Sequence, residues 1–219
     1  TYKNTVTNGL FILVSSIMFM KTGTQSYLDD AAKTWAWLES SGMRQSNGLY
    51  ADGIHTGACN MQTTLWSYNQ GVVISGLAAY YSASTNSTLL DQAEITIDAM
   101  FSDSDISTNG ILHESCDNPT SYGCGTDANS MVFKGLFMKH LQYYIDWAND
   151  ATNARYAKYY NNIWAQYSAV FHYATNSDTE SGTLWWQPDA GGSVFNGYSD
   201  QSGIDAILAA AKYGGCQST

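Results

Sequence analysis

Carboxyl side chains gather in the long loops of this sequence, between the segments with helical periodicity. They are Asp52, Glu114, Asp117, Asp127, Asp178, Glu180, Asp189 and Asp200. Two carboxyl groups that face one glycosidic bond can cleave it, because one protonates the leaving oxygen while the other acts as nucleophile or activates water. Asp52, Glu114 and Asp127 stand in the motifs described below, so we expect these three to line a subsite and bind sugar hydroxyls.

Each of these three carboxylates also has a plainer structural role open to it. Asp52 precedes Gly53 and suits a turn. Glu114 could be a solvated loop residue, and Asp127 could cap the helix expected to begin near Ser130. The residues alone leave both roles open.

A polar and aromatic stretch leads directly into an apolar helix within residues 66–80. Tyr68, Asn69 and Gln70 bring a phenol and two amides to the entrance of this helix, where buried amides need hydrogen-bond partners. Trp66 adds a flat ring, and a pyranose presents both hydroxyls and an apolar face of C–H groups. We therefore expect sugar contacts here, with helix capping by Asn69 as the alternative.

Three further residues extend the expected sugar site. Trp185 and Trp186 lie in a long polar loop, where they can stack on a sugar or pack into the core. Lys134 is a cation at the start of an apolar helix, so we expect it to pair with Asp127 or Glu114, or to snorkel to the surface. The expected sugar-binding set is therefore Asp52, Trp66, Tyr68, Asn69, Gln70, Glu114, Asp127, Lys134, Trp185 and Trp186.

The cysteines and one sequon favour a secreted, extracellular protein. Cys116 and Cys124 flank a short loop and are predicted to form a disulfide, with a pair of free thiols as the alternative. The partners of Cys59 and Cys216 stay open. Asn86 begins an Asn-Ser-Thr sequon in a predicted turn, and we expect it to be a glycosylation site.

Composition excludes several classes of partner. The 219 residues carry a net charge of −10 with nine Lys and Arg residues, which argues against binding nucleic acid or an anionic membrane. The longest apolar run, residues 10–20, is too short to cross a bilayer. We expect no metal and no cofactor, because phosphate-loop and dinucleotide motifs are absent and the histidines lack metal-site spacing. The histidines are His55, His113, His140 and His172.

Two kinds of helical segment alternate along the chain. Segments 5–21, 70–82, 130–147 and 202–213 are mostly apolar and are predicted to be interior helices. Segments 25–40, 88–101 and 154–173 are predicted to cover them, because each has a single apolar face. In the first cover helix, this face contains Tyr27, Leu28, Ala31, Trp35 and Leu38.

The alternation follows a repeat of helical hairpins. Gly9, Gly76, Gly135 and Gly203 fall in or near the start of the interior helices, at intervals of roughly 65 residues. Stacked hairpins with their long loops at one end predict an all-α toroid, the (α/α)6 barrel. Six such hairpins need about 390 residues, so this chain holds about three and a half. We therefore expect residues 1–219 to form a partial domain, completed by N-terminal hairpins or by a second chain.

Several short motifs occur in order over essentially the whole chain. They are residues 2–4 with 8–9, 49–54, 66–71 with 76–77, 110–116, 124–127, 133–137 and 201–206. In these motifs the chain resembles the C-terminal portion of glycoside hydrolase family 76, the α-1,6-mannanases and related fungal cell-wall mannan enzymes. The resemblance implies an (α/α)6 barrel, an α-mannan substrate and retaining, endo-acting hydrolysis.

The resemblance also implies where the catalytic pair lies. In that family it consists of two adjacent aspartates upstream of the segment that matches residues 2–4. Asp29 and Asp30 are adjacent, but we expect them in the first turn of a cover helix, facing away from the long loops. The present chain is therefore expected to be inactive alone, with its catalytic pair before Tyr2.

Other functions remain open from the sequence. One is a carbohydrate-binding protein that keeps the cleft without the acid pair. Another is a different α/α-toroid enzyme that degrades polysaccharides with Asp52, Glu114 or Asp127 as catalytic groups. A related cell-wall transglycosidase is a variant of the mannanase hypothesis. An intact mass of about 40 kDa or more for the natural protein would favour the mannanase, by the same repeat length.

Overall fold

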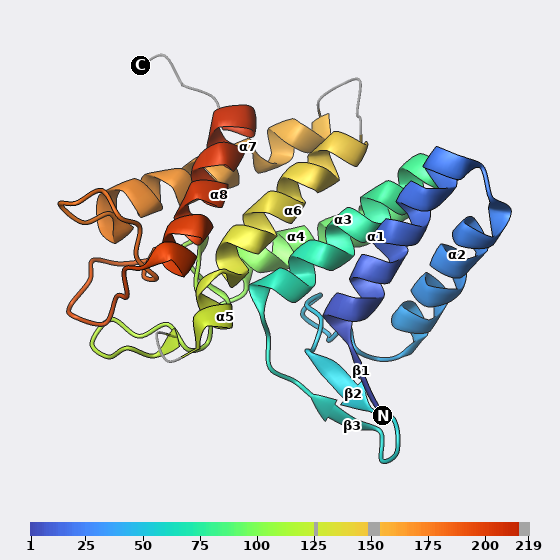
Figure 1. Ribbon diagram of the computed structural model, residues 1–219, viewed down its shortest axis with the longest axis horizontal. Helices are drawn as coiled ribbons and strands as arrows, with labels where there is room; N and C mark the ends of the chain where they lie inside the picture. Colours follow the sequence, from blue (N-terminus) through green and yellow to red (C-terminus); the bar gives the residue numbers. More distant parts are fainter. Residues whose placement is uncertain (125–126, 149–153, 215–219) are drawn as a thin grey trace.

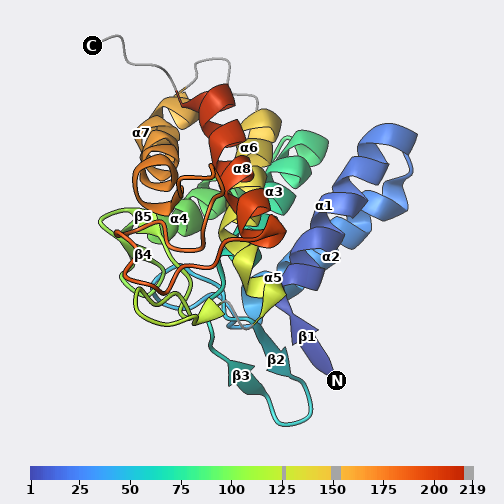
Figure 2. The same ribbon diagram turned by 60° about the vertical axis from the view of Figure 1, so that its left-hand side comes forward.

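The computed structural model describes residues 1–124, 127–148 and 154–214, and helices dominate it (Figure 1). Four helices lie side by side as an inner layer, and three pack on their outer side (Figures 1 and 2). The inner helices are α1 (Thr5–Thr22), α3 (Ser67–Ser84), α6 (Phe133–Ala148) and α8 (Gly197–Tyr213). The outer helices are α2 (Gln25–Ser40), α4 (Thr88–Ser102) and α7 (Ala154–Ala169). The predicted all-α class and its alternation of inner and cover helices are confirmed.

Short strands brace the loops near the starts of the inner helices. An antiparallel sheet joins β1 (Tyr2–Asn4), β2 (Gly53–His55) and β3 (Asn60–Gln62) in that order, with Lys3 opposite Ile54. A second antiparallel pair consists of β4 (Ser107–Thr108) and β5 (Ile111–Leu112). These strands were not predicted, because two or three residues are too few for an alternating pattern to be recognised.

Burial explains the two kinds of helix. Helix α3 packs against α1, α6 and α4, and its residues from Asn69 to Ala79 are all buried. A helix enclosed in this way needs no polar stripe. The outer helices are amphipathic, and in α2 the predicted inward residues Ala31, Trp35 and Leu38 are buried.

Glycines let neighbouring inner helices approach closely. A Cβ atom on Gly76 would lie 2.8 Å from the carbonyl oxygen of Gly9 in α1. A Cβ atom on Gly135 in α6 would overlap the backbone of Ser202 in α8. Three of the four repeated glycines, Gly9, Gly76 and Gly135, therefore mark places where side chains would push the inner helices apart. A Cβ atom on Gly203 would instead overlap Ser181 in the preceding loop.

Some helix boundaries differ from the prediction. The segment expected as one helix over 130–147 is divided into α5 (Ala128–Met131) and α6, and α7 ends in a π-helical turn at Val170–Ala174. Helix α8 begins five residues earlier than expected, because Asn196 forms a capping box with Ser199. Asp29 and Asp30 lie in the second turn of α2, not in its first.

The two helices at the ends of the inner layer are not fully interior, contrary to the prediction. Leu10, Phe11 and Val14 of α1 are exposed, as are Ile204, Ile207 and Leu208 of α8. The reason is that α1 packs on α2 and α3, and α8 on α6 and α7, which leaves one side of each uncovered by the described residues.

Among the described residues, α1 is the single helix long and apolar enough to cross a membrane by length and composition. Core helices of soluble proteins meet the same criterion, and α1 packs along α2 and α3 as such a helix does. No membrane span is therefore indicated.

Candidate functional site

Asp52 lies where the loop before β2 meets the starts of α1 and α3. Its backbone is held from two sides, because the Thr5 amide donates to the Asp52 carbonyl at 2.9 Å and the Asp52 amide donates to the Thr64 carbonyl at 3.0 Å. Its half-buried carboxylate accepts hydrogen bonds from the Tyr2 hydroxyl and, at 3.0 Å, from Asn69 Nδ2. The structure thus brings Asp52 and Asn69 together, as a sugar site at this position requires.

Asn69 has one polar atom left over. The side chain is fully buried, Nδ2 is bonded to Asp52, and the buried Oδ1 has no hydrogen-bond partner within the described part of the chain. A buried amide oxygen normally finds a donor. Trp66, not Asn69, occupies the cap position of α3, so the alternative role of Asn69 as helix cap is not the one observed.

Tyr68 links the Asp52 carboxylate to two further aromatic rings. Tyr68 packs on Phe133 with ring centroids 4.1 Å apart, and Trp66 meets Phe133 edge-on at 5.4 Å. Burial, assisted by the charge of Asp52 and a hydrogen bond to it, raises the pKa of Tyr68 to about 12. Tyr68 therefore remains a phenol, able to donate a hydrogen bond, over the whole physiological pH range.

The side chain of Gln70 bonds to the protein backbone. It is fully buried, its Oε1 accepts from the Tyr50 amide at 2.8 Å, and its Nε2 donates to the Tyr50 carbonyl at 2.9 Å. The same Nε2 also lies 3.2 Å from the Trp66 carbonyl. Its amide is thus bonded to the backbone of the preceding loop, and its expected contact with sugar stays a prediction.

Glu114 and Lys134 lie beneath the loops and not on their surface. Both residues are 1% exposed. Glu114 bonds to the Ser67 hydroxyl and backbone amide, and Lys134 donates to Asp117 Oδ2 at 2.6 Å. The expected pairing of Lys134 with Asp127 or Glu114 is therefore wrong. Asp117 is its partner, because the loop after Glu114 turns back toward α6.

The two adjacent tryptophans have different environments. Trp185 is fully buried, and Lys134 Nζ lies 5.4 Å from the centre of its ring, so the alternative of core packing is the one observed. Trp186 is half-buried beside His113, with ring centroids 5.6 Å apart. The indole nitrogen of each is buried and lacks a hydrogen-bond partner among the described residues. Only Trp186 is accessible to a ligand.

Asp127 caps a short helix. Its carboxylate accepts from the Asn129 amide at 3.0 Å at the start of α5, which is the structural alternative considered from the sequence. Its side chain is exposed, and the neighbouring residues 125–126 lie outside the described ranges.

The predicted disulfide is present. Cys116 and Cys124 are joined, and the loop between them places Asp117 beside Lys134. Cys59 is exposed and free, and Cys216 lies outside the described residues. Asn86 is exposed in the turn before α4, as a glycosylation site must be, and its use stays a prediction.

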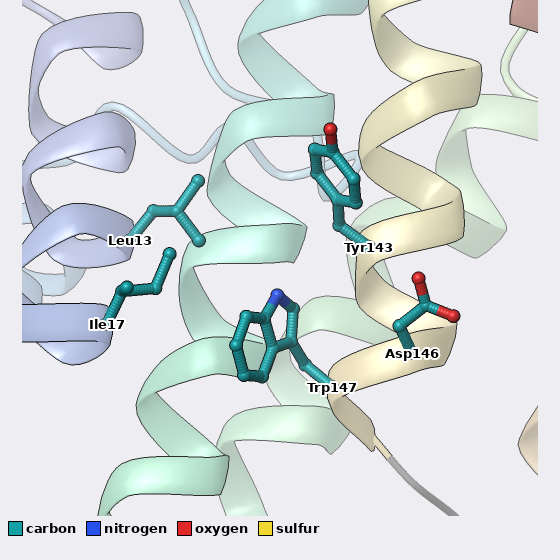
Figure 3. A pocket seen from close by; sticks show the side chains of 5 residues that line it. All are labelled: Leu13, Ile17, Tyr143, Asp146 and Trp147. Atoms are coloured by element: carbon teal, nitrogen blue, oxygen red, sulfur yellow. The ribbon is translucent and has the colours of Figure 1, made fainter. Parts of the chain in front are cut away.

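A separate hollow of about 480 Å³ lies between α1 and α6 (Figure 3). Leu13 and Ile17 reach into it from α1, while Tyr143 and Trp147 reach into it from α6, with α3 behind them. Asp146 completes the lining. The hollow is mainly apolar and lies farther along α1 than Thr5, which adjoins Asp52.

Three residues of the site were not predicted, because each bonds to a side chain from a distant segment of the chain. Tyr2, Ser67 and Asp117 each complete the site, but they lie 50, 47 and 17 residues from the side chains they bond. Tyr2 and Ser67 stand in the motifs of residues 2–4 and 66–71, and Asp117 is one of the loop carboxylates, but no local pattern showed which side chains they would meet.

Helical hairpins with their long loops at one end define the α/α-toroid class of protein, and an acid, amide and aromatic cluster lies among those loops. The family model of glycosyl hydrolase family 76 matches residues 1–212, and the chain belongs to this family. The resemblance inferred from the motifs is confirmed.

Relatives with similar sequence carry mannosidase names. The chain is 34% identical over 149 residues to mannan endo-1,6-alpha-mannosidase DCW1 of Candida glabrata, a match that covers 64% of this chain and 31% of the relative. The chain thus spans about a third of the length of such curated relatives.

Solved structures show the same fold over a longer chain. One is an inactive variant of the alpha-1,6-mannanase of Salegentibacter sp. HEL1_6 in complex with alpha-1,6-mannotetrose, with a TM-score of 0.79 and 19% identity, covering 97% of this chain and 60% of that one. Another is Dfg5 from Chaetomium thermophilum in complex with glucosamine, with a TM-score of 0.77 and 17% identity, covering 95% and 51%. The α/α-toroid fold is therefore shown.

Proposed function

We propose that the protein is a secreted, retaining, endo-acting glycoside hydrolase of α-1,6-mannan, and that this chain supplies part of its substrate cleft. Membership of family 76 supports the reaction class, and the mannosidase names of the relatives support the substrate. The Asp52 cluster carries the proposal, because a carboxylate, an unpartnered amide oxygen and aromatic rings meet at the loop end.

The accessible members of this cluster would bind the sugar. Asp52 would accept hydrogen bonds from mannose hydroxyls, and Tyr68 would donate one. The buried Asn69 would hold the Asp52 carboxylate in place. Trp66 and Trp186 would pack on the apolar face of a pyranose, as aromatic rings do in sugar sites. The buried side chains of Gln70, Glu114, Lys134 and Trp185 would support these contacts from below, and the exposed Asp127 would lie at the rim.

The catalytic aspartate pair would precede Tyr2 in the sequence. Asp29 and Asp30 do not replace it, since they lie in the second turn of α2, at the end of that helix far from the long loops. We also infer that further hairpins, in the same polypeptide or in a second chain, cover the exposed apolar sides of α1 and α8 and the hollow of Figure 3. The longer chains of the solved relatives support this inference. An intact mass of the natural protein well below about 40 kDa, with no associated chain, would contradict it.

Binding of α-1,6-mannotetraose to this chain tests the proposal. We expect calorimetry to detect binding, and α-1,4-linked mannotetraose to bind at least about tenfold more weakly, a difference of roughly 1.4 kcal/mol. The natural protein should release short α-1,6-mannooligosaccharides from mannan, and this chain alone should release none. Equal binding of both tetrasaccharides would contradict the proposal.

The alternatives give different outcomes. Binding without hydrolysis by the natural protein would identify a carbohydrate-binding protein. Hydrolysis by this chain that is abolished in Asp52→Asn would identify an enzyme with its own catalytic carboxylates. We place the protein outside the cell or in the cell wall, and the Cys116–Cys124 disulfide supports an oxidising compartment.

A further inference from the structure

The start of α3 lacks an ordinary helix cap. The cap residue is Trp66, whose side chain makes no capping hydrogen bond. The first amides of a helix have no partner within the helix, so they need acceptors from elsewhere. Ser67 is the first residue of α3, and its amide donates to Glu114 Oε2 at 3.3 Å. Glu114 therefore takes the place of the cap from a loop 47 residues away.

Glu114 is fixed on its other side as well. Its Oε1 bonds to the Ser67 hydroxyl, and its own amide donates to Asp117 Oδ2 at 2.9 Å. Asp117 is in turn paired with Lys134 of α6 at 2.6 Å, and both side chains of this pair are 1% exposed. The network thus joins the first turn of α3, the disulfide-closed loop and the first turn of α6.

The residues that follow Ser67 belong to the sugar site. Tyr68 packs on Phe133, and Asn69 donates to Asp52 at 3.0 Å. All of these contacts depend on the position of a single helical turn, the one that Glu114 holds. A shift of about 1 Å in this turn would break the bond from Asn69 to Asp52, because hydrogen bonds weaken steeply beyond about 3.2 Å.

We propose that Glu114 is a positioning residue, which holds the first turn of α3 through Ser67 and thereby orients Tyr68 and Asn69 toward Asp52 and the sugar. This inference rests on the proposed function, because it assumes that the Asp52 cluster binds mannose. It assigns Glu114 no contact with the sugar itself.

The protonation state of Glu114 gives the proposal a distinctive signature. Burial raises the pKa of Glu114 to about 8, the negative charge of Asp117 adds to this, and Lys134 and the bonds from Ser67 oppose it. The groups that face it are therefore Ser67 and Tyr68 of α3, Asp117 of its own loop, and Lys134 of α6, which is already paired. At pH 7, Glu114 is a neutral acid, and its ionisation in alkali would add a second buried negative charge beside Asp117.

Three substitutions separate positioning from bulk stability. Glu114→Gln keeps a neutral group of the same shape, whose oxygen can accept from the Ser67 amide while its nitrogen donates to the Ser67 hydroxyl oxygen. Glu114→Ala leaves the amide of Ser67 without an acceptor. Ser67→Ala removes the hydroxyl partner and creates no buried charge. The matched control is Glu180→Gln, a change at an exposed loop glutamate outside the network.

The measurements are the affinity for α-1,6-mannotetraose between pH 6 and pH 9.5 and the amide resonances of residues 67–70 without ligand. We expect the affinity of the parent chain to fall by roughly tenfold across this range, as expected for one lost contact of about 1.4 kcal/mol. Glu114→Gln should match the parent at pH 6 and show no fall. Glu114→Ala and Ser67→Ala should bind at least about fivefold more weakly at pH 6 and should shift the side-chain amide resonance of Asn69.

Several results would overturn the proposal. They are parent-like affinity in both alanine variants, an unchanged pH profile in Glu114→Gln, or unmoved Asn69 resonances in folded Glu114→Ala. If the parent chain binds no mannotetraose at any pH, the proposed function fails. The resonances of Asn69 then still decide whether Glu114 positions this turn.

Discussion

Asp52 and Glu114 are two carboxyl groups that bond to the same helical turn in different surroundings. Asp52 is bonded to Asn69 and is half-buried, with the Tyr2 hydroxyl as a further donor. Glu114 is bonded to Ser67, two residues before Asn69, and is 1% exposed. One group faces the loop end, whereas the other lies beneath it.

The difference shows that side-chain type does not determine the role of a loop carboxylate. A carboxylate that remains accessible can exchange its donors for sugar hydroxyls at little cost. A buried acid keeps its proton, because the charged form is poorly solvated, and its bonds are used within the fold. Four substitutions or conditions test this contrast.

The largest expected effect on stability comes from breaking the ion pair beside Glu114. Lys134→Ala leaves Asp117 buried without its counter-charge, so we expect a loss of about 3–5 kcal/mol in the free energy of unfolding. Urea denaturation measures it. Lys212→Ala breaks an exposed pair with Asp146 and should cost less than about 1 kcal/mol. Equal losses in the two variants would mean that burial does not distinguish these pairs.

The disulfide should stabilise the region around Glu114 and have little effect on the region around Asp52. Replacing Cys116 and Cys124 by serine opens a loop whose ends are eight residues apart, which should lower the free energy of unfolding by about 2.5 kcal/mol. Cys59→Ser, at an exposed free thiol, is the control and should change little. Thermal unfolding followed by circular dichroism tests both. NMR spectra of the serine variant and the parent chain then compare the two regions. If the resonances of Tyr2 shift as much as those of Lys134, the two regions are not independent.

Asp52→Asn should affect binding more than folding. It removes the charge that would accept mannose hydroxyls, so we expect α-1,6-mannotetraose to bind roughly tenfold more weakly, about 1.4 kcal/mol. The free energy of unfolding should change by less than about 1 kcal/mol, because the carboxylate is half-buried. Asp178→Asn, at an exposed loop residue, is the matched control for calorimetry. Unchanged affinity would remove Asp52 from the sugar site.

The effect of pH on stability is a gradual slope, spread over several pH units. The pKa of Glu114 is about 8 in the folded chain and its ordinary value is 4.5, so the unfolded chain releases this proton first as the pH rises. The contribution of Glu114 to stability is therefore complete below pH 4.5 and is lost between pH 4.5 and pH 8, by up to about 1.4 kcal/mol per pH unit. The slope measured for the parent chain minus that for Glu114→Gln isolates it. A difference of zero, or a rise with pH, would contradict the assignment of a neutral buried acid.

The helices could be predicted because their periodicity is local. Ala31, Trp35 and Leu38 recur at helical spacing and are buried, and 25–40 is a helix as predicted. The inner helices were recognised by their apolar residues and repeated glycines. The burial of the two helices at the ends of the layer was overestimated, because Val14 and Leu208 are exposed. An apolar helix needs neighbours, but its sequence does not show which neighbours are present.

The site residues were predicted less well than the helices. Asp52, Tyr68 and Asn69 do come together, because the loop before β2 and the start of α3 are both anchored at the same end. Gln70 and Lys134 were assigned to the sugar but bond to Tyr50 and Asp117. These partners lie 20 and 17 residues away, at distances where no local pattern shows which side chains will meet.

The sequence alone determined the class of fold, the alternation of inner and cover helices, the Cys116–Cys124 pair and the family. These properties follow from periodicity, short spacing and ordered motifs, which a linear chain already contains. The tertiary structure decided which carboxyl group is accessible and which is buried. That distinction depends on solvent access and on donors from distant segments, because the same acid is charged in water and neutral where water is excluded.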